Sequence, residues 1–137
     1  ASFARQIALI EAGQQEPVLK VGNLLAERDF LDVQDVCSAY VTLLKLADQN
    51  RPYPRCLNIC SGEPRKIRSM LEILLSLSSH DITTVEDPER VRPSDIPSAF
   101  GDNSAIRQAS GWKPETDLRE TLTTLLDYWR AQVKTVQ

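Results

Sequence analysis

Three charged side chains are the groups of this sequence best suited to hold an anion. Arg28 lies in a polar segment, and Arg92 and Asp95 lie together in a proline-rich stretch. The planar guanidinium of arginine donates paired hydrogen bonds to phosphate oxygens and keeps its charge, and a carboxylate accepts hydrogen bonds from sugar hydroxyls. The spacing equally allows each arginine to form a surface ion pair with a nearby carboxylate: Glu27, Asp29, Asp87 or Glu89. On composition alone the surface ion pairs are favoured.

Motifs that would carry catalysis are absent from the sequence. The five glycines are scattered singly, so there is no G-x-G-x-x-G loop, Walker loop or G-x-S-x-G elbow. None of the three tyrosines (Tyr40, Tyr53 and Tyr128) is followed four residues later by lysine. His80 is the single histidine, has no nucleophile beside it and is expected at a solvated helix end. We therefore predict no catalytic residue in this chain and a binding role instead.

The three cysteines (Cys37, Cys56 and Cys60) lie in apolar segments and are expected to be reduced, buried thiols. Their odd number does not suit a disulfide framework. A zinc site would need these three and the only histidine, at unsuitable spacing, so no metal site is predicted. Reduced thiols are typical of a cytoplasmic protein, which is the location we expect.

Length and charge exclude several classes of protein. The chain has 137 residues, 42% of them hydrophobic, with 16 basic and 19 acidic residues and a net charge of −3. A net negative charge argues against a general nucleic-acid binder, and no apolar run reaches the length of a membrane span. The chain begins without methionine or a signal-peptide pattern, so we expect a truncated, soluble domain.

The first part of the chain predicts a helix, a strand and a longer helix. Apolar residues recur at helical spacing over 3–10, and Gly13 should end that helix. A short strand is expected at 17–21, and residues 28–31 should be extended. Asp32 is placed to cap the next helix. Its apolar residues predict the buried face: Val33, Val36, Cys37, Tyr40, Val41 and Leu44.

Predicted strands and helices continue to alternate in the middle of the chain. We predict a strand at 56–60, a helix over 67–75 and a β-branched strand at 82–85. Residues 86–99 contain three prolines and several charges, which predicts a loop. A loop of this length inside a compact domain is usually functional.

Two further helices are expected near the C-terminus. Asn103 should cap a short helix that ends at Gly111. Asp117 and Glu120 resemble a capping box for the last helix. The residues expected on the buried side of that helix are Leu118, Leu122, Leu125 and Trp129.

These elements make an α/β pattern that is mostly helical with a few short strands. The strand at 56–60 is apolar apart from Asn58, as strands buried on both faces of a larger parallel sheet are. Three or four short strands make a poor sheet alone. The pattern therefore predicts that a partner domain completes the sheet.

Several runs resemble one enzyme family when they are taken in order. They are VGNLLAERDFLDVQDV at 21–36, LNICSG at 57–62, RPSD at 92–95, GDNSA at 101–105 and GWKP at 111–114. Together they resemble the C-terminal, substrate-binding part of the extended short-chain dehydrogenase/reductase family, which has a Rossmann-type fold. The resemblance covers essentially residues 1–137. It is strongest to GDP-4-keto-6-deoxy-D-mannose reductases and next to GDP-mannose 4,6-dehydratases.

The resemblance implies roles for individual residues. Arg28 and Arg92 would hold the diphosphate of a nucleotide sugar, and Asp95 the ribose. Leu19 and Val21 would line the base, partly through backbone groups. Gln6 stands where the dehydratases tend to carry lysine toward phosphate, so it is a candidate for the substrate site.

The resemblance also implies what this chain lacks. The family's N-terminal Rossmann domain supplies the NAD(P)-binding loop and a Tyr-x-x-x-Lys pair, and neither occurs in this sequence. The parent enzyme would thus be NAD(P)-dependent, with a homodimer as its expected assembly, while this chain alone is not expected to bind the cofactor or turn over. Phe30 after Arg28-Asp29, rather than Trp, favours a reductase. A dehydratase, a 4-epimerase and a non-catalytic nucleotide-sugar-binding module remain alternatives.

Overall fold

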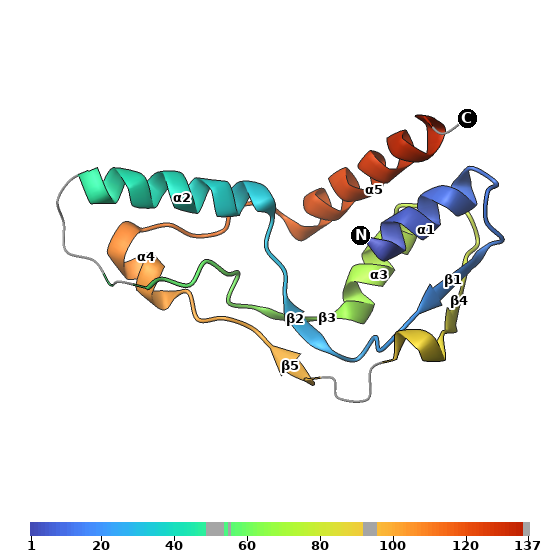
Figure 1. The fold of residues 1–137 in the computed structure, drawn as a ribbon, viewed down its shortest axis with the longest axis horizontal. Helices are drawn as coiled ribbons and strands as arrows, with labels where there is room; N and C mark the ends of the chain where they lie inside the picture. The colour runs from blue at the N-terminus through green and yellow to red at the C-terminus, as the bar shows by residue number, and fades with distance from the viewer. Residues whose placement is uncertain (49–53, 55, 92–95, 136–137) are drawn as a thin grey trace. The chain divides into compact units, whose positions relative to one another are not determined.

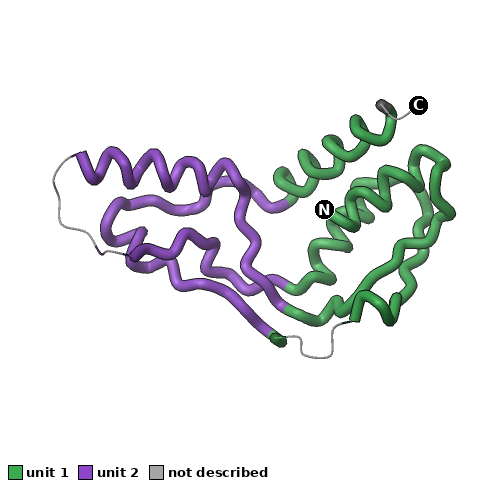
Figure 2. Tube along the Cα trace, viewed as in Figure 1, with its two compact units in different colours: residues 1–26, 66–97, 119–137 green, residues 27–65, 98–118 purple. Residues whose placement is uncertain are grey.

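The computed structural model describes all residues except 49–53, 55, 92–95 and 136–137 (Figure 1). The chain divides into two compact units, each built from separate stretches of sequence (Figure 2). Unit 1 comprises residues 1–26, 66–97 and 119–137, and unit 2 comprises residues 27–65 and 98–118.

Helix α1 (Ser2–Glu11) and strand β1 (Val18–Val21) open unit 1 and confirm the first predicted helix and strand. Beyond the end of α1, Gly13 has a φ of +68°, a conformation that glycine adopts at no steric cost. Strand β4 (Thr83–Glu86) pairs in parallel with β1, with Val18 opposite Thr83 and Val21 opposite Glu86 (Figure 1). The strand predicted at 82–85 is therefore confirmed within one residue.

Helices α3 (Ile67–Ser76) and α5 (Leu118–Thr135) complete the core of unit 1. Both were predicted from their apolar periodicity. The buried core combines residues of all these elements: Ala4, Ile7, Ile10, Leu19, Val21, Met70, Leu71, Leu74, Leu122, Leu126 and Val133. On α5 the fully buried residue is Leu126, whereas Leu125 and Trp129 are only half-buried.

Arg130 of α5 forms hydrogen bonds with Glu11 at the end of α1 and with Leu77 just after α3. Its Nε and Nη2 donate to the two carboxylate oxygens of Glu11 over 2.7 and 2.8 Å, and Nη2 also donates to the carbonyl of Leu77. The hydrogen bond from Arg130 holds the pKa of Glu11 below its usual range, although partial burial opposes this. A bidentate arginine–carboxylate pair is among the stronger charge-assisted contacts.

Replacing Arg130 with alanine is expected to lower the free energy of unfolding by about 1–3 kcal/mol, because Glu11 loses its main partner. Urea unfolding at pH 7 measures this. Arg107→Ala removes an exposed arginine from α4 and serves as the control. Equal stability of the two variants would show that the Arg130 network contributes nothing.

Unit 2 is built around helices α2 (Val33–Asp48) and α4 (Ser104–Ser110). Ala39, Ile106 and Trp112 form its buried centre, with Leu31, Leu43, Leu57 and Ile59 packed against it. The Trp112 indole N–H donates to the Ser38 hydroxyl over 2.9 Å. Strand β2 (Glu27–Asp29) lies between β3 (Pro64–Lys66) and β5 (Ser98–Ala99), and pairs in parallel with β5.

The predicted buried face of α2 is wrong. The helix packs through Asp35, Ala39 and Leu46 on the opposite side. Most of the predicted face is exposed, at 71% for Val33, 58% for Tyr40, 51% for Val41 and 71% for Leu44. The helix is apolar on both sides, and the small Ala39 allows the close approach of Ile106 and Trp112.

The strand predicted at 56–60 is absent from the described residues, which adopt no regular structure there. A strand needs a neighbour to complete its hydrogen bonds, and residues 56–60 belong to neither of the sheets that the described residues form. The expectation of buried cysteines is also wrong, because Cys37 and Cys56 are exposed and Cys60 is half-buried. The three described cysteines are free.

The loop predicted at 86–99 and the helix cap predicted at Asn103 both need correction. The stretch predicted as an unstructured loop contains a 3₁₀ turn, η1 (Pro88–Arg90), and strand β5. Asn103 precedes α4 as expected, but its side chain makes no cap hydrogen bond. The Asp102 carboxylate instead accepts from the Ser104 N–H over 2.8 Å. The helix ends at Gly111 with a φ of +74°, as predicted.

Candidate functional site

Arg28, the predicted phosphate ligand, lies half-buried in β2 of unit 2. Its Nη1 donates to the carbonyl of Glu27 over 2.7 Å, which holds the guanidinium close to the strand. The next residue, Asp29, is the last residue of the strand. The position of Arg28 therefore depends on how firmly Asp29 is anchored.

Asp29 is anchored by backbone N–H groups from two distant segments. Its Oδ1 accepts from Ser61 over 2.8 Å, and its Oδ2 accepts from Gly62 over 3.0 Å and Gly101 over 3.2 Å. Partial burial disfavours the charged carboxylate, but the hydrogen bonds from Ser61, Gly101 and Gly62 outweigh it and hold the pKa of Asp29 below its usual value. Asp29 is thus a structural centre of unit 2 beside Arg28.

Asp29→Asn is expected to destabilise the protein by roughly 1–3 kcal/mol at pH 7, because an amide nitrogen cannot accept these hydrogen bonds. The Asp29 carboxyl has a lower pKa in the folded state than its ordinary value of 3.8. Its contribution is therefore present above about pH 4 and is lost as the pH falls through the folded-state pKa. Urea unfolding of both proteins at pH 7 and pH 3 should show the difference shrinking at pH 3, with Asp81→Asn as a surface control. A difference of the same size at both pH values would contradict the role of the charge.

Two close approaches fix the same turn. The buried Asn103 amide donates to the carbonyls of Cys60 over 3.0 Å and Ser61 over 2.9 Å. Gly101 lies so close to Cys60 that a Cβ at this position would stand 2.6 Å from Sγ. Residues 60–62 and 101–103 are therefore held together beside Asp29 without room for a larger side chain at residue 101.

Leu19 and Val21, the predicted base-lining residues, lie in β1 of unit 1. Both side chains point into the core, with Leu19 fully buried and Val21 at 4% exposure. The Val21 carbonyl accepts from the N–H of Asp87 over 2.8 Å. Val21 also borders a cavity of about 320 Å³ whose charged lining residues are Arg68 and Glu86.

Gly22 lines the same cavity of about 320 Å³ and lies against Arg90, the last residue of η1. A Cβ on Gly22 would lie 2.5 Å from the carbonyl oxygen of Arg90, so only glycine lets the two backbones come so close. The turn that follows β1 is thereby fixed against the segment that leads to residue 92.

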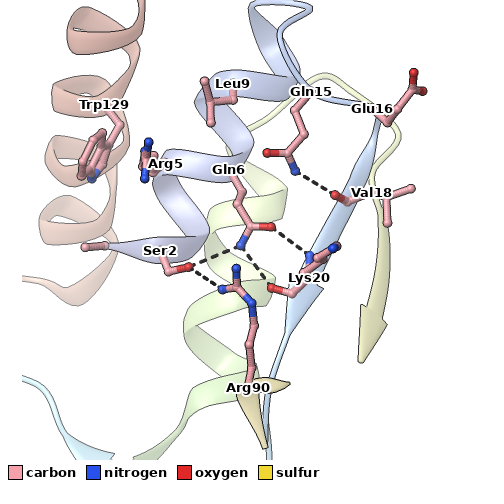
Figure 3. A pocket seen from close by; sticks show the side chains of 11 residues that line it. Ser2, Arg5, Gln6, Leu9, Gln15, Glu16, Val18, Lys20, Arg90 and Trp129 are labelled. Atoms are coloured by element: carbon pink, nitrogen blue, oxygen red, sulfur yellow. Dashed lines mark hydrogen bonds between the residues drawn. The ribbon is translucent and has the colours of Figure 1, made fainter. Parts of the chain in front are cut away.

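Gln6, the remaining predicted ligand, is buried in α1 and its amide is already engaged (Figure 3). Its Oε1 accepts from the Lys20 N–H over 2.9 Å, and its Nε2 donates to the Lys20 carbonyl over 3.1 Å. These two bonds imitate a neighbouring strand and complete the free edge of β1. Gln6 therefore positions β1 between Leu19 and Val21.

The structure thus brings Gln6, Leu19 and Val21 together in unit 1 and places Arg28 in unit 2. Arg92 and Asp95 lie outside the described residues, so their roles stay predictions. Sequence reasoning missed Asp29 and Asn103 as organising residues. The sequence predicts Asp29 only as an ion-pair partner for Arg28. The available signal was its residue type, because aspartate side chains commonly accept hydrogen bonds from backbone N–H groups.

Other kinds of site find little support in the described part of the chain. It contains no group of three or more His, Cys, Asp or Glu side chains placed to hold a metal ion. Among the helices of the same part, none combines the length and hydropathy that crossing a bilayer requires.

Comparison with known proteins places this arrangement in a family. The family model described as GDP-mannose 4,6 dehydratase matches residues 1–125. The GDP-6-deoxy-D-mannose reductase of Pseudomonas aeruginosa is 38% identical over 134 residues, which are 98% of this chain and 43% of the relative. The GDP-6-deoxy-D-talose 4-dehydrogenase of Aggregatibacter actinomycetemcomitans is 28% identical over 72% of this chain and 32% of its own length.

A solved structure agrees with these sequence matches. The structure of RMD from Pseudomonas aeruginosa, complexed with NADPH, superposes with a TM-score of 0.81 at 37% identity, over 96% of this chain and 42% of that one. The chain thus spans about two fifths of the length of this structure and of the reductase. The fold is that of the C-terminal part of an extended short-chain dehydrogenase/reductase, as the sequence predicted. With the family model matching most of its length, this chain belongs to the GDP-mannose 4,6 dehydratase family.

Proposed function

We propose that this chain is the substrate-binding part of an NAD(P)-dependent reductase that acts on a GDP-linked 4-keto-6-deoxy sugar. The observation that carries the proposal is the 38% identity to a GDP-6-deoxy-D-mannose reductase along 98% of this chain. The nicotinamide cofactor and the groups that transfer hydride and proton would lie in a Rossmann half outside these residues. The protein would be cytoplasmic.

Arg28 is the proposed anchor of the substrate diphosphate. Its half-buried position lets a phosphate approach while the surrounding protein weakens competition from water. Arg92 would supply the second guanidinium and Asp95 an acceptor for the ribose hydroxyls. Two charge-assisted contacts to one diphosphate would orient the sugar toward the cofactor.

The base would lie along β1, in the cavity of about 320 Å³ that Val21 borders. Leu19 would shape this strand from within the core, since its side chain is fully buried. Gln6 would contribute indirectly by holding the backbone of β1 at Lys20, because both polar atoms of its amide are occupied there.

The exposed apolar face of α2 is the proposed contact surface for the Rossmann half. This face consists of Val33, Cys37, Tyr40, Val41 and Leu44. A contiguous apolar face of this kind on one helix is typical of a protein–protein or domain interface. Residues 56–60 lie in the same unit without strand partners among the described residues, as expected if a parallel sheet in the other half completes them.

A dehydratase is the second candidate, because the matching family model carries that description. The two activities differ in redox balance. Reducing a keto sugar consumes one NADPH per turnover, whereas removing water from GDP-mannose to give a 4-keto-6-deoxy sugar is redox-neutral and consumes none.

A graft tests the proposal directly. It joins the N-terminal part of the Pseudomonas reductase, which this chain does not match, to Ala1 of this chain. Calorimetric titration of the graft with GDP should show saturable one-to-one binding, and the N-terminal part alone is the control. A graft that binds NADPH, and is therefore folded, but gives no heat with GDP would refute the substrate-binding assignment.

A further inference from the structure

The side chains of Arg28 and Asp29 leave β2 on opposite faces, because consecutive side chains of a strand alternate. Asp29 would therefore not touch an anion that Arg28 holds. Its carboxylate accepts three backbone N–H groups of residues 61, 62 and 101, over 2.8, 3.0 and 3.2 Å. Arg28 is also paired with Ala99 of β5 in the sheet of unit 2. The backbone of Arg28 is thus held by the sheet and, through the next residue, by three further hydrogen bonds.

The three N–H groups that bind Asp29 are positioned by contacts of their own. The buried Asn103 amide donates to the carbonyls of Cys60 and Ser61, which form the turn before Gly62. Gly62 has a φ of +78°, and a Cβ there would stand 3.2 Å from the Asn103 amide nitrogen. Two segments about 40 residues apart in sequence therefore present a preformed group of donors to one carboxylate.

This group of donors requires the charged form of Asp29. Partial burial raises the pKa of the carboxyl, but the hydrogen bonds from residues 61, 101 and 62 outweigh burial and hold the pKa below its ordinary value. The carboxylate is charged at neutral pH and offers acceptors on both oxygens. An asparagine amide has one acceptor oxygen, so at least one of the three N–H groups would face an NH2 group. The end of β2 would then have to shift.

We infer that Asp29 is a positioning residue of the proposed diphosphate site, which sets the direction of the Arg28 guanidinium through β2 without touching the substrate. The inference rests on the proposed function, because it requires Arg28 to hold the diphosphate. An arginine–phosphate contact with two parallel hydrogen bonds depends on the orientation of the guanidinium plane. A small displacement of β2 is therefore expected to weaken binding even though the charge of Arg28 remains.

A double-mutant cycle in the 137-residue chain tests this coupling. GDP is the probe, and its dissociation constant is read from the nitrogen–proton NMR shifts of the β2 backbone, in spectra that also report folding. Asp29→Asn is expected to raise the dissociation constant about tenfold. In the Arg28→Ala protein, which has lost the guanidinium, the same substitution should change the constant by less than about twofold. A merely structural role would weaken binding equally in both backgrounds.

Gly101→Ala disturbs the same donors while the carboxylate stays in place, and it carries the test should Asp29→Asn fail to fold. The added Cβ would stand 2.6 Å from the Cys60 Sγ, so residue 101 has to move. The loss of one hydrogen bond to Asp29 is expected to raise the dissociation constant of GDP about threefold. Adding Cys60→Ala removes the Sγ and should restore part of the affinity. Asp48→Asn removes an exposed carboxylate of the same unit and should leave the affinity unchanged.

The outcomes separate the inference from the proposed function. Equal weakening by Asp29→Asn with and without the Arg28 guanidinium would overturn the inference and leave the diphosphate clamp in place. Unchanged GDP affinity in both Asp29→Asn and Gly101→Ala, with weaker binding in Arg28→Ala, would do the same. Unchanged affinity in Arg28→Ala would instead refute the clamp, and the positioning role would be refuted with it.

Discussion

In the graft, Arg28→Ala is expected to raise the dissociation constant of GDP about 10- to 100-fold. Removing one charge-assisted contact to a phosphate costs roughly 1.5–3 kcal/mol, and each 1.4 kcal/mol corresponds to about a factor of ten. Because Asp29 anchors β2 through three backbone N–H groups, the substitution should remove the charge without moving the strand. Calorimetric titration with GDP measures the change.

Two further variants separate the effect of the Arg28 guanidinium from the general effect of removing a positive charge. Arg28→Lys keeps the charge but loses the planar pair of donors, so an intermediate affinity is expected. Arg107→Ala removes an exposed arginine from α4 and should leave the affinity as it was. If Arg28→Ala and Arg107→Ala bound GDP with the same affinity as the unsubstituted graft, the diphosphate clamp would have to be placed elsewhere.

The second large effect concerns the exposed face of α2. The double substitution Tyr40→Asp with Leu44→Asp should prevent the graft from folding around NADPH, because two carboxylates would be buried against the Rossmann half. Burying an unpaired charge costs at least about 3 kcal/mol, which is a large part of the stability of a typical domain. The yield of soluble, NADPH-binding graft measures this loss.

The same double substitution should be nearly silent in the 137-residue chain, where both side chains are more than half exposed. A change in the free energy of unfolding of no more than about 0.5 kcal/mol per site is expected there. Gln34→Asp, on an exposed polar position of the same helix, is the control in both proteins. A doubly substituted graft that still binds NADPH in full yield would show that α2 faces solvent in the longer protein as well.

Periodicity predicted the helices well where only one side of a helix is apolar. Helices α1 and α3 and strands β1 and β4 begin and end within one residue of their predicted bounds, whereas the parallel pairing of β1 with β4 was not predicted. Helix α2 failed for a physical reason. Its larger apolar side is exposed, while its smaller side, around Ala39, packs in the core, and hydrophobicity alone cannot rank two such faces.

The ligand roles of the candidate site stay predictions. Arg28 is a candidate through the resemblance, since composition alone favours surface ion pairs, and the structure adds that the neighbouring Asp29 is anchored by three backbone N–H groups. That anchoring joins residues 72 positions apart, which local spacing does not reveal. Gln6 was selected through resemblance to a phosphate ligand, yet its amide completes the edge of β1, a pairing set by tertiary structure.

Turnover by the graft tests the central proposal most directly. With NADPH and a GDP-linked 4-keto-6-deoxy sugar, absorbance at the nicotinamide band should fall as one NADPH is consumed per sugar reduced. This chain alone should consume none under the same conditions. A graft that binds both GDP and NADPH but leaves the NADPH absorbance constant with the keto sugar would contradict the proposal that this chain presents such a sugar to the cofactor of a reductase.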